Sequence, residues 1–190
     1  MKPLTLYPLD AQDHLVQPDD FISTEISSEL KTPALSWLTD FKQHRPTMLE
    51  ADTLATDALM MLEREHSHLK LVVDEKEALL GLISSRQLSA QSIMRRVVLG
   101  EARSEITVRD LMLTRQQLKA FAYQDLARST IGEVLKTLQR EGEAYCLVLD
   151  RDNHQIRGVL SSEDIAARLQ LPKQLSPAPT FLQLCDSVFA

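Results

Sequence analysis

Gly81-Leu82-Ile83-Ser84-Ser85 and Gly158-Val159-Leu160-Ser161-Ser162 are two copies of one short pattern, and this repetition decides the fold. The match continues upstream, where the equivalent pairs are Leu71 and Leu147, Val72 and Val148, Asp74 and Asp150. The offset is 76 residues upstream and 77 residues after one inserted position. A long, fixed period marks a duplicated supersecondary unit. The chain therefore contains two copies of one unit.

The second copy shows its expected elements most plainly. Thr130 and Glu133 form a capping box, and apolar residues then recur every three or four positions, which predicts a helix. Short β-prone runs flank the turn-forming residues 150–153. The unit is thus β-α-β-β-α, and its elements are residues 118–123, 130–140, 144–149, 155–160 and 162–169.

The first copy repeats this order with a longer closing helix. Its predicted helix, strands and closing helix are residues 53–64, 69–73, 78–83 and 86–99, with Gly100 as the C′ residue. A short helix at residues 108–112 then opens the second copy. Each unit has only roughly 45 to 55 core residues, so the two copies should pack their sheets together. We predict an α/β (α+β) fold in which the repeats form a pseudo-twofold pair.

These elements give four predicted regions. They are an N-terminal acidic arm and helix (1–43), a first repeat with its connecting helix (44–105), a second repeat (106–170) and a C-terminal tail (171–190). Thr32 and Pro33 begin the helix of the first region, which carries Leu35, Trp37, Leu38 and Phe41, after an extended arm over residues 1–30. The tail has helical apolar spacing over residues 181–189, which suits either a helix docked on its own domain or a partner-binding segment.

Composition excludes several classes of function. The chain has 190 residues, a formal charge of −6 and 44% hydrophobic residues, with no apolar stretch long enough to cross a bilayer and no signal-like N-terminus. We expect a cytoplasmic protein that binds neither membrane nor nucleic acid. Cys146 and Cys185 lack metal-site spacing, so we expect two thiols and no metal site. No catalytic motif is present.

Charge is unevenly distributed along the chain. Residues 1–43 hold seven acids against three lysines, a net charge of −4, whereas residues 86–115 hold six arginines against three acids, a net charge of +3. The basic stretch suits either a solvated helix face or recognition of a phosphate or partner.

The two β-α-β-β-α copies resemble a tandem pair of CBS domains, the Bateman module. The resemblance covers roughly residues 46–169, and Gly158-Val159-Leu160-Ser161-Ser162-Glu163-Asp164 is similar to the family's Gly-h-h-(Ser/Thr)-x-x-Asp signature. It implies two clefts between the repeats, commonly bound by AMP, ADP, ATP or S-adenosylmethionine. No further cofactor is implied.

The resemblance also implies candidate binding residues. In the first cleft Asp164 would accept both ribose hydroxyls and Ser161 would assist a phosphate, whereas Glu163 would oppose one. The opposite repeat would complete this cleft with Thr47, His68 and Leu69. A purely structural explanation is also open: Asp164 can be a first-turn acid favoured by the helix dipole, and Ser161 and Ser162 can be N-cap residues without a ligand role.

The second cleft would combine side chains from both repeats: Ser84, Arg86, Gln87, Tyr123, Ala144 and Tyr145. Gln87 replaces the family's ribose-binding Asp, so we expect weaker binding there.

Two functions remain open from sequence. The first is a non-enzymatic regulatory protein that binds an adenosine-containing ligand beside Asp164, forms a homodimer and acts on an unidentified regulated protein. The second is a dimerisation or adaptor scaffold with degenerate sites. Leu35, Trp37, Leu111 and Met112 are the candidate dimer-interface residues.

Overall fold

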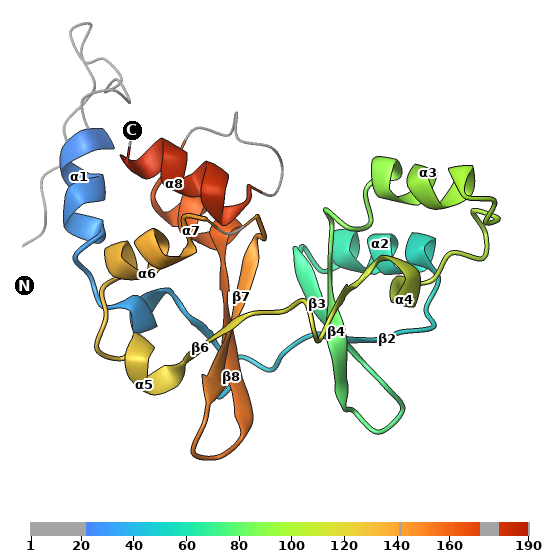
Figure 1. Cartoon of the computed structure of the whole chain (residues 1–190), viewed down its shortest axis with the longest axis horizontal. Helices are drawn as coiled ribbons and strands as arrows, with labels where there is room; N and C mark the ends of the chain where they lie inside the picture. The colour runs from blue at the N-terminus through green and yellow to red at the C-terminus, as the bar shows by residue number, and fades with distance from the viewer. Residues whose placement is uncertain (1–21, 141, 172–178, 190) are drawn as a thin grey trace, which may run out of the picture.

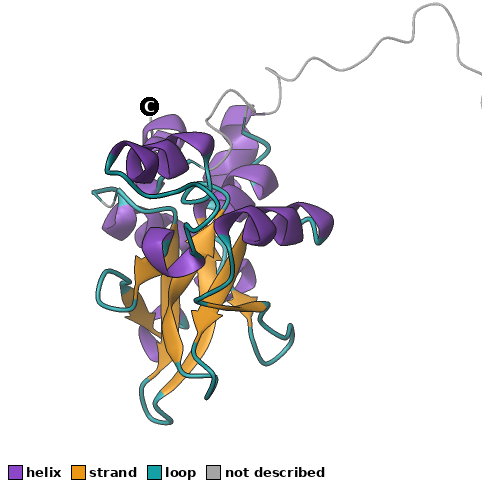
Figure 2. Cartoon of the chain, turned by 90° about the vertical axis from the view of Figure 1, so that its right-hand side faces the viewer, coloured by secondary structure: helices purple, strands orange, loops and turns teal. Residues whose placement is uncertain are grey.

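The computed structural model describes residues 22–140, 142–171 and 179–189, and it contains two four-stranded sheets that face each other (Figure 1). Each sheet is flanked by helices of its own repeat. Figure 2 shows that the strands run from the helical side to hairpin turns at the opposite end. The predicted mixed α/β fold with two packed repeats is confirmed.

The second repeat forms the sheet of strand order β1-β8-β7-β6. β6 and β7 are parallel, and β7 and β8 are antiparallel, so helix α6 makes the crossover between the parallel pair. The elements are β6 (Ala120–Ala122), α5 (Tyr123–Leu126), α6 (Ile131–Leu138), β7 (Tyr145–Asp150), β8 (Gln155–Ser161) and α7 (Ser162–Arg168). The capping box of Thr130 and Glu133 begins α6 as predicted.

The first repeat forms the sheet of order β2-β3-β4-β5 with the same pattern of pairing. Its elements are β2 (Met48–Glu50), α2 (Ala55–Arg64), β3 (Leu69–Val73), β4 (Leu79–Ser84), α3 (Ala90–Val98), α4 (Val108–Leu111) and β5 (Leu113–Thr114). The closing helix starts later than predicted, because Ser89 caps it. Gly100 follows with a φ of 98°, as the C′ prediction requires.

Each sheet is completed by a strand that comes from outside its own repeat. β1 (Thr39–Asp40) precedes the first repeat but pairs with β8 of the second, and β5 lies in the lead-in of the second repeat (106–170) but pairs with β4 of the first. The exchanged β1 is fixed further by Asp40, which accepts two hydrogen bonds of 2.7 Å from Arg157. Arg157 also stacks on the ring of Tyr123. Neither sheet is therefore built from one repeat alone.

The repeated glycines exist because of this exchange. Gly158 is paired with Asp40 and Gly81 with Thr114. A Cβ atom on Gly158 would overlap the carbonyl oxygen of Thr39, and one on Gly81 would overlap that of Leu113. Only glycine lets the exchanged strand approach so closely.

The N-terminal region differs from its prediction. The helix expected from Thr32 to Phe41 is a single 3-10 turn, η2 (Ala34–Trp37), because the chain leaves it to form β1. Upstream, the expected extended arm contains helix α1 (Ile22–Glu29), and residues 1–21 lie outside the described residues. Trp37 is buried and covered by the guanidinium of Arg168, 4.0 Å from its ring centroid. Trp37 is thus a core residue and was wrongly assigned to a dimer interface.

Three apolar clusters stabilise the molecule. One lies between the sheets and joins the repeats through Leu71, Leu82, Tyr145 and other side chains of both. The other two lie beneath the helices of each repeat. The cluster of the second repeat includes Phe181, Leu184 and Cys185 of α8 (Phe181–Phe189), all fully buried. The tail is therefore docked on its own domain, as one of its two interpretations predicted.

Candidate functional site

The first candidate site lies where β8 ends and α7 begins. The Ser161 hydroxyl accepts a hydrogen bond of 3.3 Å from the Asp164 amide, so it caps α7 and places Glu163 and Asp164 in its first turn. The residues before β3 of the other repeat lie opposite: His68 Nδ1 is 3.2 Å from Glu163 Oε1. Side chains of both repeats therefore meet at this position.

Glu163 lies in an unfavourable environment for a charge. Its side chain is 19% exposed, and among the described residues its Oε2 is buried without a hydrogen-bond partner. Burial raises the pKa of Glu163, the neighbouring Asp164 raises it further, and His68 lowers it. A cation or hydrogen-bond donor at this position would satisfy the buried oxygen.

Asp164 is the carboxylate best placed to meet a ligand. The Asp164 residue is exposed, yet partial desolvation of its carboxyl group by the surrounding protein raises its pKa. The charge of His68 and the hydrogen bond with Ser161 act in the opposite direction. Thr47 and Leu69 lie beside His68, where the Thr47 hydroxyl donates a 3.4 Å hydrogen bond to the Leu69 carbonyl. The structure thus brings together the six residues assigned to the first cleft.

The second candidate site is the pseudo-twofold counterpart of the first. Arg86 takes the place of Glu163, and its guanidinium donates a 3.5 Å hydrogen bond to the Gly142 carbonyl of the other repeat. Gln87 takes the place of Asp164, and its amide oxygen accepts a short hydrogen bond from the buried Ser84 hydroxyl. The amide that replaces the ribose-binding carboxylate is therefore already engaged by its own repeat.

Tyr145 lies between the two sites. Its hydroxyl donates a 3.4 Å hydrogen bond to the His68 carbonyl of the first site. Burial raises the pKa of Tyr145 to about 12, and the carboxylates of Glu163 and Asp164 in the first site also raise it. The Ser84 hydroxyl and Arg86 of the second site lower it. Sequence reasoning assigned Tyr145 to the second cleft only. Its neighbour Ala144 accepts a 2.9 Å hydrogen bond from the Ser162 amide, so it borders the first site also.

Tyr123 does not join the second site. Tyr123 is the first residue of α5 and follows Ala122, which pairs with Leu149 near the C-terminal end of β7. Tyr145 is at the N-terminal end of β7. The residue equivalent to Thr47 is Lys119: the Lys119 carbonyl accepts a bond from Leu147, as that of Thr47 does from Leu71. Matching the two parallel strand pairs, rather than the helices, would have found Lys119.

The two sites therefore differ in charge. Glu163 and Asp164 make the first site acidic, with the His68 imidazole as the neighbouring counter-group. Arg86 and Lys119 make the second site basic, although Glu143 lies close to Lys119. The first site suits a sugar with neutral or cationic substituents, and the second suits an anion.

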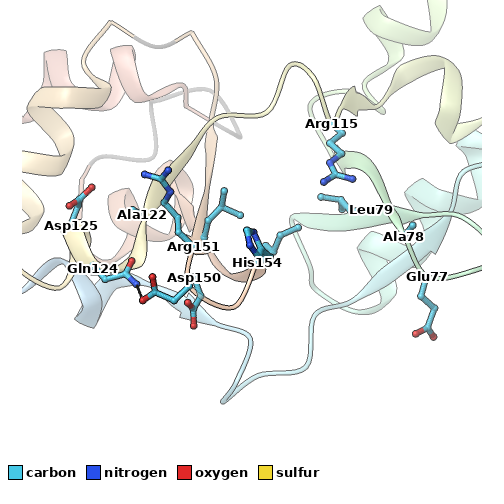
Figure 3. A pocket seen from close by; sticks show the side chains of 13 residues that line it. Glu77, Ala78, Leu79, Arg115, Ala122, Gln124, Asp125, Asp150, Arg151 and His154 are labelled. Atoms are coloured by element: carbon cyan, nitrogen blue, oxygen red, sulfur yellow. Dashed lines mark hydrogen bonds between the residues drawn. The ribbon is translucent and has the colours of Figure 1, made fainter.

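A separate groove of about 950 Å³ opens at the hairpin end, between the β3–β4 and β7–β8 turns (Figure 3). Arg115, Arg151 and His154 line it together with four carboxylates, those of Glu77, Asp125, Asp150 and Asp152. Asp152 accepts a 2.7 Å hydrogen bond from Gln124. Because acids outnumber arginines, the groove does not favour a phosphorylated ligand.

Two features are absent from the described part of the chain. It contains no group of three His, Cys, Asp or Glu side chains arranged to hold a metal ion. None of its helices is long and apolar enough to cross a bilayer.

Comparison with known proteins agrees with this architecture. The model of the CBS domain matches residues 38–96 and 127–171, more than half of the chain. No curated protein matches the sequence.

Solved structures share the fold at low sequence identity. An uncharacterized conserved protein from Pyrococcus horikoshii has a TM-score of 0.54 and 16% identity, over 77% of this chain and 98% of that one. A conserved CBS domain protein of unknown function from Thermoplasma acidophilum has a TM-score of 0.52 and 18% identity, over 79% and 76%. CBSX2 in complex with AMP has a TM-score of 0.50 and 18% identity, over 74% and 97%. Two matched segments, two equivalent sheets and these relatives lead to one conclusion: the chain belongs to the CBS-domain family, as two CBS repeats in tandem.

Proposed function

We propose that this chain is a non-catalytic regulatory protein whose first site binds an adenosine-containing ligand. The observation that carries the proposal is the solvent-accessible Asp164 carboxylate, held in the first turn of α7 opposite His68 of the other repeat. A carboxylate in this position can accept hydrogen bonds from both hydroxyls of a ribose. The AMP bound by CBSX2, which shares the fold, supports an adenosine ligand.

Charge then selects among adenosine ligands. Each added phosphate brings negative charge toward Glu163 and Asp164, and among the described residues the His68 imidazole is their one nearby counter-group. Affinity should therefore fall from AMP to ADP to ATP. S-adenosylmethionine should bind most tightly, because its ammonium group can donate a hydrogen bond to the buried Glu163 oxygen and its sulfonium adds positive charge near the two carboxylates.

Regulation follows from the position of the site between repeats. A ligand shifts a conformational equilibrium only if it binds the two states differently. The contact between His68 and Glu163 joins the repeats, so a ligand that competes for Glu163 changes how the repeats are held together. We propose that a homodimer in the cytoplasm passes this change to a regulated protein.

The test is calorimetric titration of the 190-residue protein with AMP, ADP, ATP, S-adenosylmethionine and NAD. Asp164→Ala should weaken binding by about ten- to a hundredfold, the loss of a charged acceptor worth roughly 1.5–3 kcal/mol. Asp57→Ala is the matched control, because Asp57 is also an acid in the first turn of a helix, α2. The Asp57→Ala variant should bind ligand as tightly as the unaltered protein does. Equal affinity in Asp164→Ala and the unaltered protein would overturn the ribose assignment.

A ligand-free scaffold is the second candidate function. The hydrogen bond between Ser84 and Gln87 favours it, because both groups are satisfied without a ligand. A scaffold would give no binding heat with any of the five ligands, and substitution of Asp164 would then be without effect.

A further inference from the structure

The tail helix α8 is anchored on the turn of helix that carries the first site. The fully buried hydroxyl of Ser162 donates a short hydrogen bond to the carbonyl of Pro179, two residues before α8 begins. Ser162 is the first residue of α7 and is followed at once by Glu163 and Asp164. The first turn of α7 therefore carries both carboxylates of the site and the anchor of the tail.

A second contact joins α8 to the same place. The Phe181 amide donates a 2.9 Å hydrogen bond to the Glu143 carbonyl, and the Ser162 amide donates one of 2.9 Å to the carbonyl of the next residue, Ala144. Both helices thus begin on adjacent peptide groups just before β7, and they pack against each other (Figure 1). The first turn of α7 cannot shift without disturbing the start of α8.

Burial holds the rest of α8 in place. Phe181, Leu184 and Cys185 are fully buried, and the Cys185 thiol donates a 3.2 Å hydrogen bond to the Leu135 carbonyl of α6. α8 has nine residues, and helices this short are marginally stable in water without such packing. Undocking of α8 is therefore a local opening that exposes Cys185 while the two sheets stay intact.

We propose that occupancy of the first site controls the docking of α8. This inference rests on the proposed function, because it takes the ligand to bind Glu163 and Asp164 in the first turn of α7. A ligand held by this turn favours the position of α7 in which Ser162 reaches Pro179, so the ligand stabilises the docked tail. Linkage then requires docking of α8 to strengthen ligand binding by the same factor.

The first repeat provides a matched control for this connection. Ser85 is the equivalent of Ser162: its amide donates a 3.3 Å hydrogen bond to the His68 carbonyl, as that of Ser162 does to Ala144. Among the described residues the Ser85 hydroxyl has no hydrogen-bond partner. Removal of the Ser85 hydroxyl should therefore leave the docking of α8, and its response to ligand, unchanged.

Thiol labelling of Cys185 measures the docking of α8. The background is the 190-residue protein with Cys146→Ala, in which Cys185 is the one cysteine left in the sequence. Burial, and then the neighbouring Asp186, raise the pKa of Cys185 to about 11. Labelling by a disulfide reagent at neutral pH therefore proceeds through the undocked state, because the thiolate is the reactive form.

Ligand should slow this labelling. S-adenosylmethionine or AMP, each at a concentration that saturates its calorimetric titration, should lower the rate at least fivefold, the lower end of common coupling factors.

Two serine variants test the route of the coupling. Ser162→Ala should label about two- to tenfold faster without ligand, the effect of one lost hydrogen bond. The slowing by ligand should fall below twofold in Ser162→Ala, a change that a merely structural anchor would not cause. Ser85→Ala should match the background protein in both measurements.

The outcomes separate this inference from the proposed function. If calorimetry finds binding but neither ligand slows the labelling, the coupling is wrong and the ligand site stands. The same conclusion follows if ligand slows the labelling of Ser162→Ala as much as that of Ser85→Ala. If calorimetry finds no binding of either compound, the proposed function fails and the coupling fails with it.

Discussion

Replacing Gly158 by alanine should release the exchanged strand β1 from the second repeat. The new Cβ would overlap the Thr39 carbonyl oxygen and lie 2.8 Å from Leu38 Cδ1. Carbon atoms in contact normally stay about 3.5–4.0 Å apart. The strand must therefore shift by about 1 Å or leave β8.

The expected cost follows from these contacts. Overpacking at a close contact costs about 1–3 kcal/mol, and displacement of β1 also disturbs the hydrogen bonds between Asp40 and Arg157. We expect a loss of about 2–3 kcal/mol in the free energy of unfolding. For a protein of this size each kcal/mol lowers Tm by about 2–4 °C, so the predicted fall is roughly 4–12 °C.

Thermal unfolding by circular dichroism measures this fall. Gly142→Ala is the matched control, because a Cβ at Gly142 meets no described atom within 4 Å and should change the unfolding free energy by less than about 0.5 kcal/mol. Gly81→Ala should behave like Gly158→Ala, since its Cβ would overlap Leu113. If the Tm of Gly158→Ala equals that of the Gly142→Ala control, the close approach of β1 is not the reason for the repeated glycine.

Four further predictions concern the sites, the tail and pH. Gln87→Asp should add ribose affinity at the second site, and calorimetry that finds unchanged affinity and stoichiometry would contradict the account of that site. Glu163→Gln removes a buried negative charge, so ATP should bind more tightly relative to AMP, and an unchanged ratio would exclude Glu163 as the selective residue. Leu184→Ala should cost about 2–5 kcal/mol in a urea titration, because this α8 side chain is fully buried against the core of the second repeat, and a cost below 1 kcal/mol would mean that α8 is not docked. The hydrogen bond from Arg157 holds the pKa of Asp40 below its usual value near 3.8. The stability that this pair adds is therefore present above pH 4 and is lost as pH falls through the lowered pKa. Asp40→Asn should flatten the dependence of Tm on pH in that range.

Much of the fold could be predicted because the two copies confirm each other. The capping box of Thr130 and the apolar runs of β3 and β7 are local signals, and they fixed these elements within one or two residues. The exchange of β1 and β5 is a tertiary feature and has no local periodicity. Its one signal in the sequence is the pair Gly81 and Gly158. Sequence analysis used these glycines to align the repeats but did not predict that another strand approaches closely at each of them.

The candidate site was predicted less completely. Asp164 and Glu163 were assigned through the signature and His68 through the opposite repeat that completes the cleft, and the three do lie together. Tyr123 was assigned through its position in the leading strand and lies at the other end of β7. A short strand of three residues gives no periodicity from which to fix its register. For the same reason Lys119 was missed.

The exchange of β1 and β5 also sets an order for synthesis. Residues 39–40 leave the ribosome early, but their partner β8 is complete only when residue 161 has been made. The first sheet likewise lacks its edge until residues 113–114 emerge. Long sequence separations of this kind slow folding and postpone it until most of the chain is available. A cut between the repeats, at any point from residue 99 to residue 107, would give two fragments that each carry the edge strand of the other, so the fragments should complete their sheets only by associating.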